Sequence, residues 1–117
     1  MKKLVYVSHP YGGLEENRIN LENTINTLEE EGEYFDLVFK NCSSLLPSSR
    51  KQFTFVSPIH AFGFRYEQDD YIDGLEKCID LLEVCDIVLM CLGWEESKGC
   101  VAEYFYALAK GKEIVFE

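Results

Sequence analysis

The chain has 117 residues, of which 47% are hydrophobic and 27% charged, a composition typical of a globular protein rather than a disordered one. With 21 acidic against 11 basic residues, the formal net charge is −10. We therefore expect neither a nucleic acid polymer nor an anionic membrane surface as partner, because binding them needs a basic surface. No apolar run is long enough to span a membrane. The length predicts one domain, residues 1–117, and the apolar stretch before Ser8 is too short for a signal peptide, so we expect a cytoplasmic protein.

The N-terminal third predicts a strand, a turn and a helix. The run KLVYVS, residues 3–8, is apolar and rich in β-branched and aromatic residues, as strands are, and HPYGG follows it as a turn. A helix is predicted from Leu14 onward by apolar residues at helical spacing, namely Leu14, Leu21, Ile25 and Leu28. Gly32 is expected to cap the end of this helix.

The middle third contains two candidate strands. Residues 34–39 and 53–56 are both apolar and aromatic, and the pattern leaves open whether one or both belong to the sheet. The segment between them, residues 40–52, is serine-rich and polar with a proline, which is typical of a loop.

The last third predicts helix, strand, helix and strand. Helical spacing of apolar residues runs from Asp69 to Val84, and the run IVLMCL that follows Asp86 is apolar on both faces, as in a central parallel strand. In the next helix we expect the inward face to be the apolar stripe of Val101, Ala102, Phe105, Leu108 and Ala109. Gly111 ends that helix, and EIVF is a short last strand.

Strands that alternate with helices predict an α/β fold with a parallel sheet covered on both sides. In such sheets ligands bind beyond the carboxyl ends of the strands. Polar and glycine-rich stretches follow the predicted strands at this edge: SHPYGG, SPIHAFG and GWEESKG. The sequence therefore predicts a ligand site there.

Glu103 is the strongest candidate for chemistry at this site. If Ser97 caps the helix, Glu103 lies within about two turns of its start, where the helix dipole favours an ionised carboxylate. A positioned, ionised carboxylate is suited to attack on a sugar carbon or to stabilising an oxocarbenium ion. The alternative is a solvated glutamate, because Glu103 lies opposite the apolar stripe.

The other candidate residues would bind a ligand rather than react with it. Glycines beside Tyr11 let backbone amides approach a ligand, although neither a GxGxxG nor a Walker pattern is present, and an ordinary tight turn explains them equally well. Hydroxyl and amide groups can orient ribose, a histidine can contact a base or phosphate, and Trp94 can stack on a base. The predicted substrate-binding residues are Ser8, Gly12, Gly13, Asn17, His60, Gly93, Trp94, Ser97 and Gly99.

Cysteine and histidine spacing argues against a metal site, and we expect no cofactor. The five cysteines include no CxxC pair, and His9 and His60 lie far from them in sequence. Cys78, Cys85 and Cys91 lie in apolar segments and are expected to be small buried side chains.

Taken together, these motifs resemble the nucleoside 2-deoxyribosyltransferase superfamily, and in particular its small bacterial and phage branch. The resemblance covers most of the chain outside about residues 30 to 52, and the last motif is the most specific. It rests on Asn17 and on these stretches: VYVSHPYGG, SPIHAFGF, CIDLLEVCDIVLM and GWEESKGCVAEYFYALAKGKEI.

This resemblance implies a flavodoxin-like (Rossmann-like) three-layer sandwich with a parallel sheet of about five strands, in a homo-oligomer whose sites lie near subunit contacts. It implies that Glu103 attacks the anomeric carbon of 2-deoxyribose and that Tyr11 helps to position the sugar. One position departs from the family: an aspartate in the helix before the central strand, which binds sugar or protonates the base, is replaced here by Cys78. A thiol is a poor proton donor for a nucleobase.

These observations leave three functions open. The first is cleavage of the N-glycosidic bond of a nucleoside or nucleotide, by hydrolysis or deoxyribosyl transfer, through Glu103. The second is a nucleotide-binding or sensing module that keeps the fold without turnover, which the replacement at Cys78 favours. The third is a structural or interaction protein with a vestigial pocket, which the acidic surface permits.

Overall fold

The computed structural model describes residues 3–42, 53–62 and 71–117. Its strands are β1 (Lys3–Ser8), β2 (Phe53–Val56), β3 (Ile87–Met90) and β4 (Glu113–Phe116). They pair in parallel, in the order β2-β1-β3-β4. The helices are α1 (Glu15–Glu30), α2 (Gly32–Val38), α3 (Pro58–Phe62), α4 (Tyr71–Glu83), the 3-10 turn η4 (Trp94–Glu96) and α5 (Lys98–Ala109).

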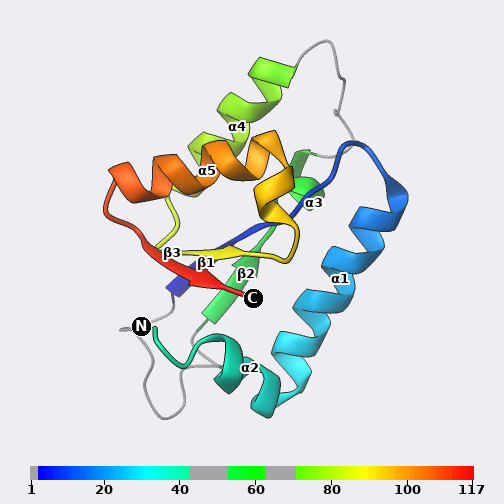
Figure 1. The fold of residues 1–117 in the computed structure, drawn as a ribbon, viewed down its shortest axis with the longest axis vertical. Coiled ribbons are helices and arrows are strands. Elements are labelled where there is room, and N and C mark those ends of the chain that lie inside the picture. Colours follow the sequence, from blue (N-terminus) through cyan, green and yellow to red (C-terminus); the bar gives the residue numbers. More distant parts are fainter. Residues whose placement is uncertain (1–2, 43–52, 63–70) are drawn as a thin grey trace.

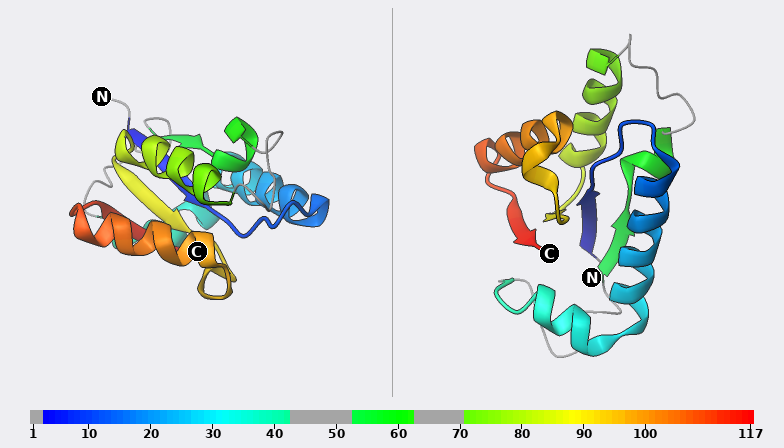
Figure 2. Two further views of the ribbon diagram at one scale, coloured as in Figure 1. Left: turned by 90° about the horizontal axis from the view of Figure 1, so that it is seen from above. Right: turned by 45° about the vertical axis from the view of Figure 1, so that its right-hand side comes forward.

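The predicted α/β class is confirmed, with helices on both sides of a parallel sheet as in a flavodoxin-like fold. Helices α4 and α5 lie together on one side of the strands, and α1 and α2 lie on the other (Figure 1). The right-hand view of Figure 2 shows the same separation of the two helix pairs. The described residues form four strands rather than the expected five.

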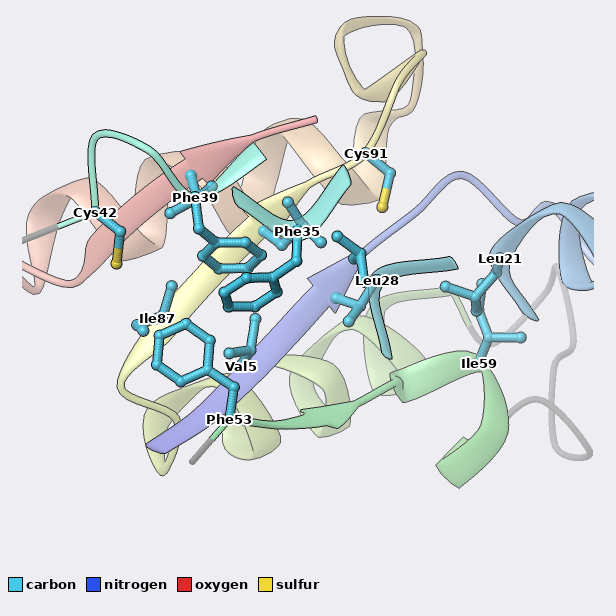
Figure 3. Close-up of a cluster of buried hydrophobic side chains, with 13 residues drawn as sticks. Val5, Leu21, Leu28, Phe35, Phe39, Cys42, Phe53, Ile59, Ile87 and Cys91 are labelled. Carbon is cyan, nitrogen blue, oxygen red and sulfur yellow. The ribbon is translucent and has the colours of Figure 1, made fainter. Parts of the chain in front are cut away.

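Only one of the two candidate segments in the middle third forms a strand, and the packing of their aromatic residues explains which. Residues 53–56 form β2, whereas residues 34–38 lie in helix α2. Phe35 and Phe39 are four positions apart and therefore share one helical face, where their rings stack with centroids 4.6 Å apart and both contact Phe53 (Figure 3). The expected cap at Gly32 is also wrong, because α1 ends at Glu30 and Gly32 begins α2.

Strand β1 turns alternate side chains to the two faces of the sheet. Val5 and Val7 join the aromatic cluster on the α1 side. Tyr6 is part of the smaller cluster on the α5 side, and Ser8 is buried two positions further along the same face. The α5 side of β1 therefore carries two buried hydroxyl groups.

Helix α5 presents the opposite face from the one expected. Its buried residues are Cys100, Glu103 and Ala107, whereas Phe105 is 60% exposed and Leu108 is 50% exposed. The hydroxyls of β1 explain this orientation, because they supply the polar partners that a buried carboxylate requires. Phe105, Leu108 and Ala109 of the apolar stripe are consequently left on the outside.

Helix α4 contributes its C-terminal half to the α5 side of the core through Cys78 and Leu82. Of the expected elements, Asp69, most of the 40–52 loop and the last residues of SPIHAFGF lie outside the described residues. No helix in the described part of the chain is long and apolar enough to cross a membrane.

Phe35→Ala tests the assignment of residues 32–38 as helix. Phe35 is 1% exposed and Leu37 is 62% exposed, which fits a helix, whereas in a strand both would face the same side. We expect Phe35→Ala to lower the free energy of unfolding by about 3–5 kcal/mol and the control Leu37→Ala to change it by less than about 0.5 kcal/mol. Equal losses in urea unfolding would contradict the helix.

Candidate functional site

Glu103 lies on the buried side of α5, about a turn and a half beyond the start of the helix. Ser97 is the N-cap, as expected, and its Oγ accepts a hydrogen bond of 3.3 Å from the backbone amide of Cys100. The Glu103 side chain points at the sheet and is only 5% exposed. The alternative reading of Glu103 as a solvated helix glutamate is therefore wrong.

Two hydroxyl groups of β1 hold the Glu103 carboxylate. The Tyr6 hydroxyl donates to Oε2, and Ser8 Oγ donates to Oε1 at 2.8 Å. Each carboxylate oxygen thus has its own donor, and both donors come from one face of one strand. This arrangement fixes the plane of the carboxylate and satisfies its buried oxygens.

The ionisation of Glu103 is balanced between two opposing effects. Burial raises the pKa of Glu103 to about 7, although the hydrogen bonds from Tyr6 and Ser8 lower it. Burial, and secondarily the nearby Glu103 carboxylate, raises the pKa of Tyr6 well above its usual value. Near neutral pH, Tyr6 is therefore a neutral donor beside a carboxylate that is partly ionised.

Two thiols flank this group. Burial raises the pKa of Cys78 to about 11, with a further contribution from Glu103, while a hydrogen bond with Tyr6 acts in the opposite direction. Burial also raises the pKa of Cys100, whose thiol forms hydrogen bonds with the side chains of Ser8 and Ser97. Cys78, the position identified from the sequence as a departure, therefore does lie beside Glu103.

Tyr6 was not among the predicted site residues. A signal for it was present in the sequence, because Tyr6 and Ser8 are two positions apart in a strand and must share a face. The apolar run KLVYVS by itself predicts only that Tyr6 is a core residue of a strand. Its partner Glu103 is 97 positions away in the chain, so no pattern of neighbouring residues in the sequence predicts this contact.

A pocket of about 650 Å³ opens at the same edge of the sheet, on the α1 side. It brings together three predicted binding residues, Asn17, Gly93 and Ser97, but Glu103 is not part of its wall. Most residues of the wall have polar side chains, which include amides, hydroxyls and carboxylates. Its residues are His9, Pro10, Asn17, Asn20, Asn23, Thr24, Leu92, Gly93, Glu96, Ser97 and Glu117.

The turn after β1 is built from the predicted Tyr11-Gly12-Gly13 segment. Gly12 and Gly13 have φ values of 61° and 76°, a left-handed conformation that glycine adopts without strain. Asn17 Nδ2 donates to the Tyr11 carbonyl at 2.8 Å and so holds the turn against α1. The Tyr11 side chain packs on the α1-side core, whereas Glu103 lies on the α5 side.

The remaining predicted binding residues do not converge on Glu103. His60 lies in α3, where its Nε2 is 2.9 Å from Glu22 Oε2 and its Nδ1 is 3.1 Å from Ser57 Oγ. The Trp94 ring packs against Tyr104 and Phe116, with centroid separations of 4.8 and 5.9 Å. Gly99 lies in the first turn of α5 and does not line the pocket.

A metal ion has no evident place in the described segments, where no group of three histidine, cysteine or carboxylate side chains is arranged to bind one. At Glu103 the structure supplies a carboxylate with two hydroxyl donors. Such a group can act as a nucleophile when ionised or as a general acid when protonated.

The pKa of Glu103 predicts a pH-dependent stability difference between the wild type and Glu103→Gln. Because the folded-state pKa, about 7, exceeds the ordinary value of 4.5, proton binding stabilises the fold below pH 4.5, and this stabilisation is lost as the pH rises through 7. Between pH 5.5 and 8 the wild type should lose about 2 kcal/mol relative to Glu103→Gln.

Urea unfolding at several pH values measures this difference, and the range stays above the sequence pI of about 4.6, where solubility is lowest. Glu95→Gln, which removes an exposed carboxylate nearby, controls for the change of one charge. A stability gap that is constant with pH would show that Glu103 is not perturbed.

Comparison with known proteins identifies the family. None of the curated proteins matches the chain. The sequence profile described as "Domain of unknown function (DUF4406)" matches residues 3–116, which includes every strand of the sheet and Glu103. The chain therefore belongs to the DUF4406 family.

Proposed function

We propose that this protein cleaves the N-glycosidic bond of a nucleoside or nucleotide in the cytoplasm, as a hydrolase or a deoxyribosyltransferase, with Glu103 as nucleophile. The observation that carries the proposal is the buried Glu103 carboxylate held by Tyr6 and Ser8 beside the carboxyl end of β1. The resemblance of its motifs to the nucleoside 2-deoxyribosyltransferase superfamily supports the proposal. We propose that this chain, a member of the DUF4406 family, belongs to a branch of that superfamily.

In this mechanism one oxygen of ionised Glu103 attacks the anomeric carbon as the bond to the base breaks. The resulting glycosyl ester is then resolved by water, or by a second base in the transferase. Tyr6 and Ser8 orient the carboxylate and favour its ionised form by donating hydrogen bonds. Tyr11 packs on the other side of the sheet, so the geometry favours Tyr6 as the tyrosine that hydrogen-bonds to Glu103. We propose that Tyr11 positions the sugar.

The second candidate is a binding or sensing module without turnover. A specific observation favours it: the pocket that contains Asn17, Gly93 and Ser97 does not include Glu103. The Cys78 thiol beside Glu103 favours it as well, because a thiol with a pKa of about 11 is a weak acid for a leaving base.

We also propose that the protein is a homo-oligomer that associates through the α5 outer face, defined as Phe105 and Leu108 of α5 with Phe116 of β4. All three side chains are about half exposed or more, and Tyr104 links Phe105 to Phe116 through ring contacts of 5.4 and 6.0 Å. The exposed residues Glu95 and Lys110 lie just before and just after α5. A two-fold axis that packs α5 antiparallel to its copy would bring these opposite charges together.

Chromatography of a panel of deoxynucleosides and deoxynucleoside 5′-monophosphates, with and without a second base, tests the enzymatic function. We expect release of free base that falls by roughly 10³-fold or more in Glu103→Gln, because the nucleophile is lost. Tyr6→Phe should lower the rate by about 10- to 100-fold and move the acid limb of the rate profile to higher pH, because a hydrogen bond to the charged carboxylate is lost. Tyr104→Phe, which removes a hydroxyl from a ring packed on Trp94, is the matched control.

The same panel identifies the binding module. Thermal stabilisation by a panel member without any product would exclude the enzyme and favour sensing. If the pocket holds that ligand, Asn20→Ala should abolish the stabilisation and Glu103→Gln should preserve it, because Asn20 is part of the pocket wall and Glu103 is not.

Sedimentation velocity tests the α5 outer face. We expect a dimer or larger assembly for the wild type and dissociation in Phe105→Ser, which removes the most exposed aromatic side chain of α5. Leu37→Ser, on the far side of the sheet in α2, is the control and should leave the mass unchanged. A wild-type protein that sediments as a monomer at all concentrations would contradict the proposal.

A further inference from the structure

Among the described residues, the side chains that contact the Glu103 carboxylate or its donors are neutral. Its two hydrogen-bond donors are the hydroxyls of Tyr6 and Ser8, and the groups beside them are the thiols of Cys78 and Cys100. Within the described residues no lysine, arginine or histidine contributes to the pKa of Glu103. When Glu103 ionises, its charge is therefore buried without a counter-ion from the part of the chain that the structure describes.

A buried charge without a partner is unfavourable, and proteins normally pair it or leave it protonated. Any counter-charge that pairs with the ionised Glu103 has to come from outside this cluster of hydroxyls and thiols. The rest of the chain does not oppose a cation, because the formal net charge is −10. A positively charged ligand is therefore the chemical complement of this site.

The Cys78 thiol is the side chain beside Glu103 whose acidity decides how well a leaving base could be protonated. Loss of a neutral purine or pyrimidine is assisted by protonation of the base, which needs a good acid close to the glycosidic bond. Burial raises the pKa of Cys78 to about 11, so this thiol, in contact with Tyr6 beside Glu103, gives up its proton poorly. A base that already carries a positive charge leaves as a neutral molecule and needs no proton.

We infer that the substrate carries a permanent positive charge on the ring nitrogen of its N-glycosidic bond, as pyridinium nucleosides and nucleotides do. This inference rests on the proposed N-glycosidic function and names its substrate class. Attack by a Glu103 oxygen on the anomeric carbon forms a C–O bond as the C–N bond breaks. The electron pair of the C–N bond passes to the ring nitrogen and cancels its charge. Water then cleaves the glycosyl ester, which returns the carboxylate and releases the sugar and one proton.

The binding part of the inference is tested with two small probes that differ in charge, 1-methylnicotinamide (a pyridinium cation) and neutral nicotinamide. The apparent affinity for the cation, measured by calorimetry, should rise about tenfold from pH 6 to pH 8, because the ionised fraction of a group with a pKa of about 7 rises from about a tenth to nine tenths. Glu103→Gln should lose this pH dependence. Equal binding of both probes, or cation binding that survives unchanged in Glu103→Gln, would overturn the inference.

The catalytic part is tested by comparing nicotinamide riboside with adenosine, uridine and the deoxynucleoside panel at pH 8, each corrected for the reaction without protein. We expect release of nicotinamide at least about 100-fold faster than release of any neutral base, because a neutral base leaves without the general acid that ordinarily contributes about 10²-fold or more. This release should be lost in Glu103→Gln. Cleavage of neutral nucleosides at equal or higher rates would overturn the substrate inference and leave the N-glycosidic function standing. No cleavage of any compound would overturn both.

Discussion

The buried contact between the Glu103 carboxylate and the hydroxyls of Tyr6 and Ser8 is the constraint on which the rest of the α5 side depends. A carboxylate that is almost fully removed from water is costly unless its oxygens are hydrogen-bonded. Both donors must therefore lie on the same face of β1, and α5 must start where Ser97 caps it, so that Glu103 arrives opposite them. The alternation of side chains along β1, the Ser97 cap and the rotation of α5 about its axis together bring Glu103 into contact with Tyr6 and Ser8.

The same contact accounts for the unusual outside of α5. Turning Glu103 and Cys100 toward the sheet leaves Phe105 and Leu108 on the surface, together with Phe116 of the edge strand β4. The polar interior and the apolar exterior of this helix are therefore two consequences of one rotation about its axis. If the outer face is covered by a second copy, catalysis and assembly would depend on the same twelve-residue helix.

The other end of the sheet edge is organised by a different carboxylate. Glu117 accepts hydrogen bonds from the Leu92 amide at 3.0 Å and from the Tyr34 hydroxyl at 2.6 Å, and so joins the loop after β3 to α2. This arrangement helps to form the wall of the open pocket on the α1 side. Two separate polar constellations thus occupy the carboxyl edge, one enclosed around Glu103 and one open, which is why binding and turnover have to be measured separately.

Local periodicity, turn residues and a helix cap are enough to predict the α/β class, the positions of β1, β3 and β4, and Glu103 as a candidate residue. They leave open whether residues 34–39, residues 53–56 or both form a sheet strand, because both segments are apolar and aromatic and only the packing of Phe35 against Phe53 distinguishes them. The same sequence patterns also predict the wrong inward face for α5, because an apolar stripe is ordinarily the buried one. Only the tertiary structure reversed that face and recruited Tyr6 to the site, because the hydroxyls that make a buried Glu103 tolerable lie on a strand more than ninety residues earlier in the chain.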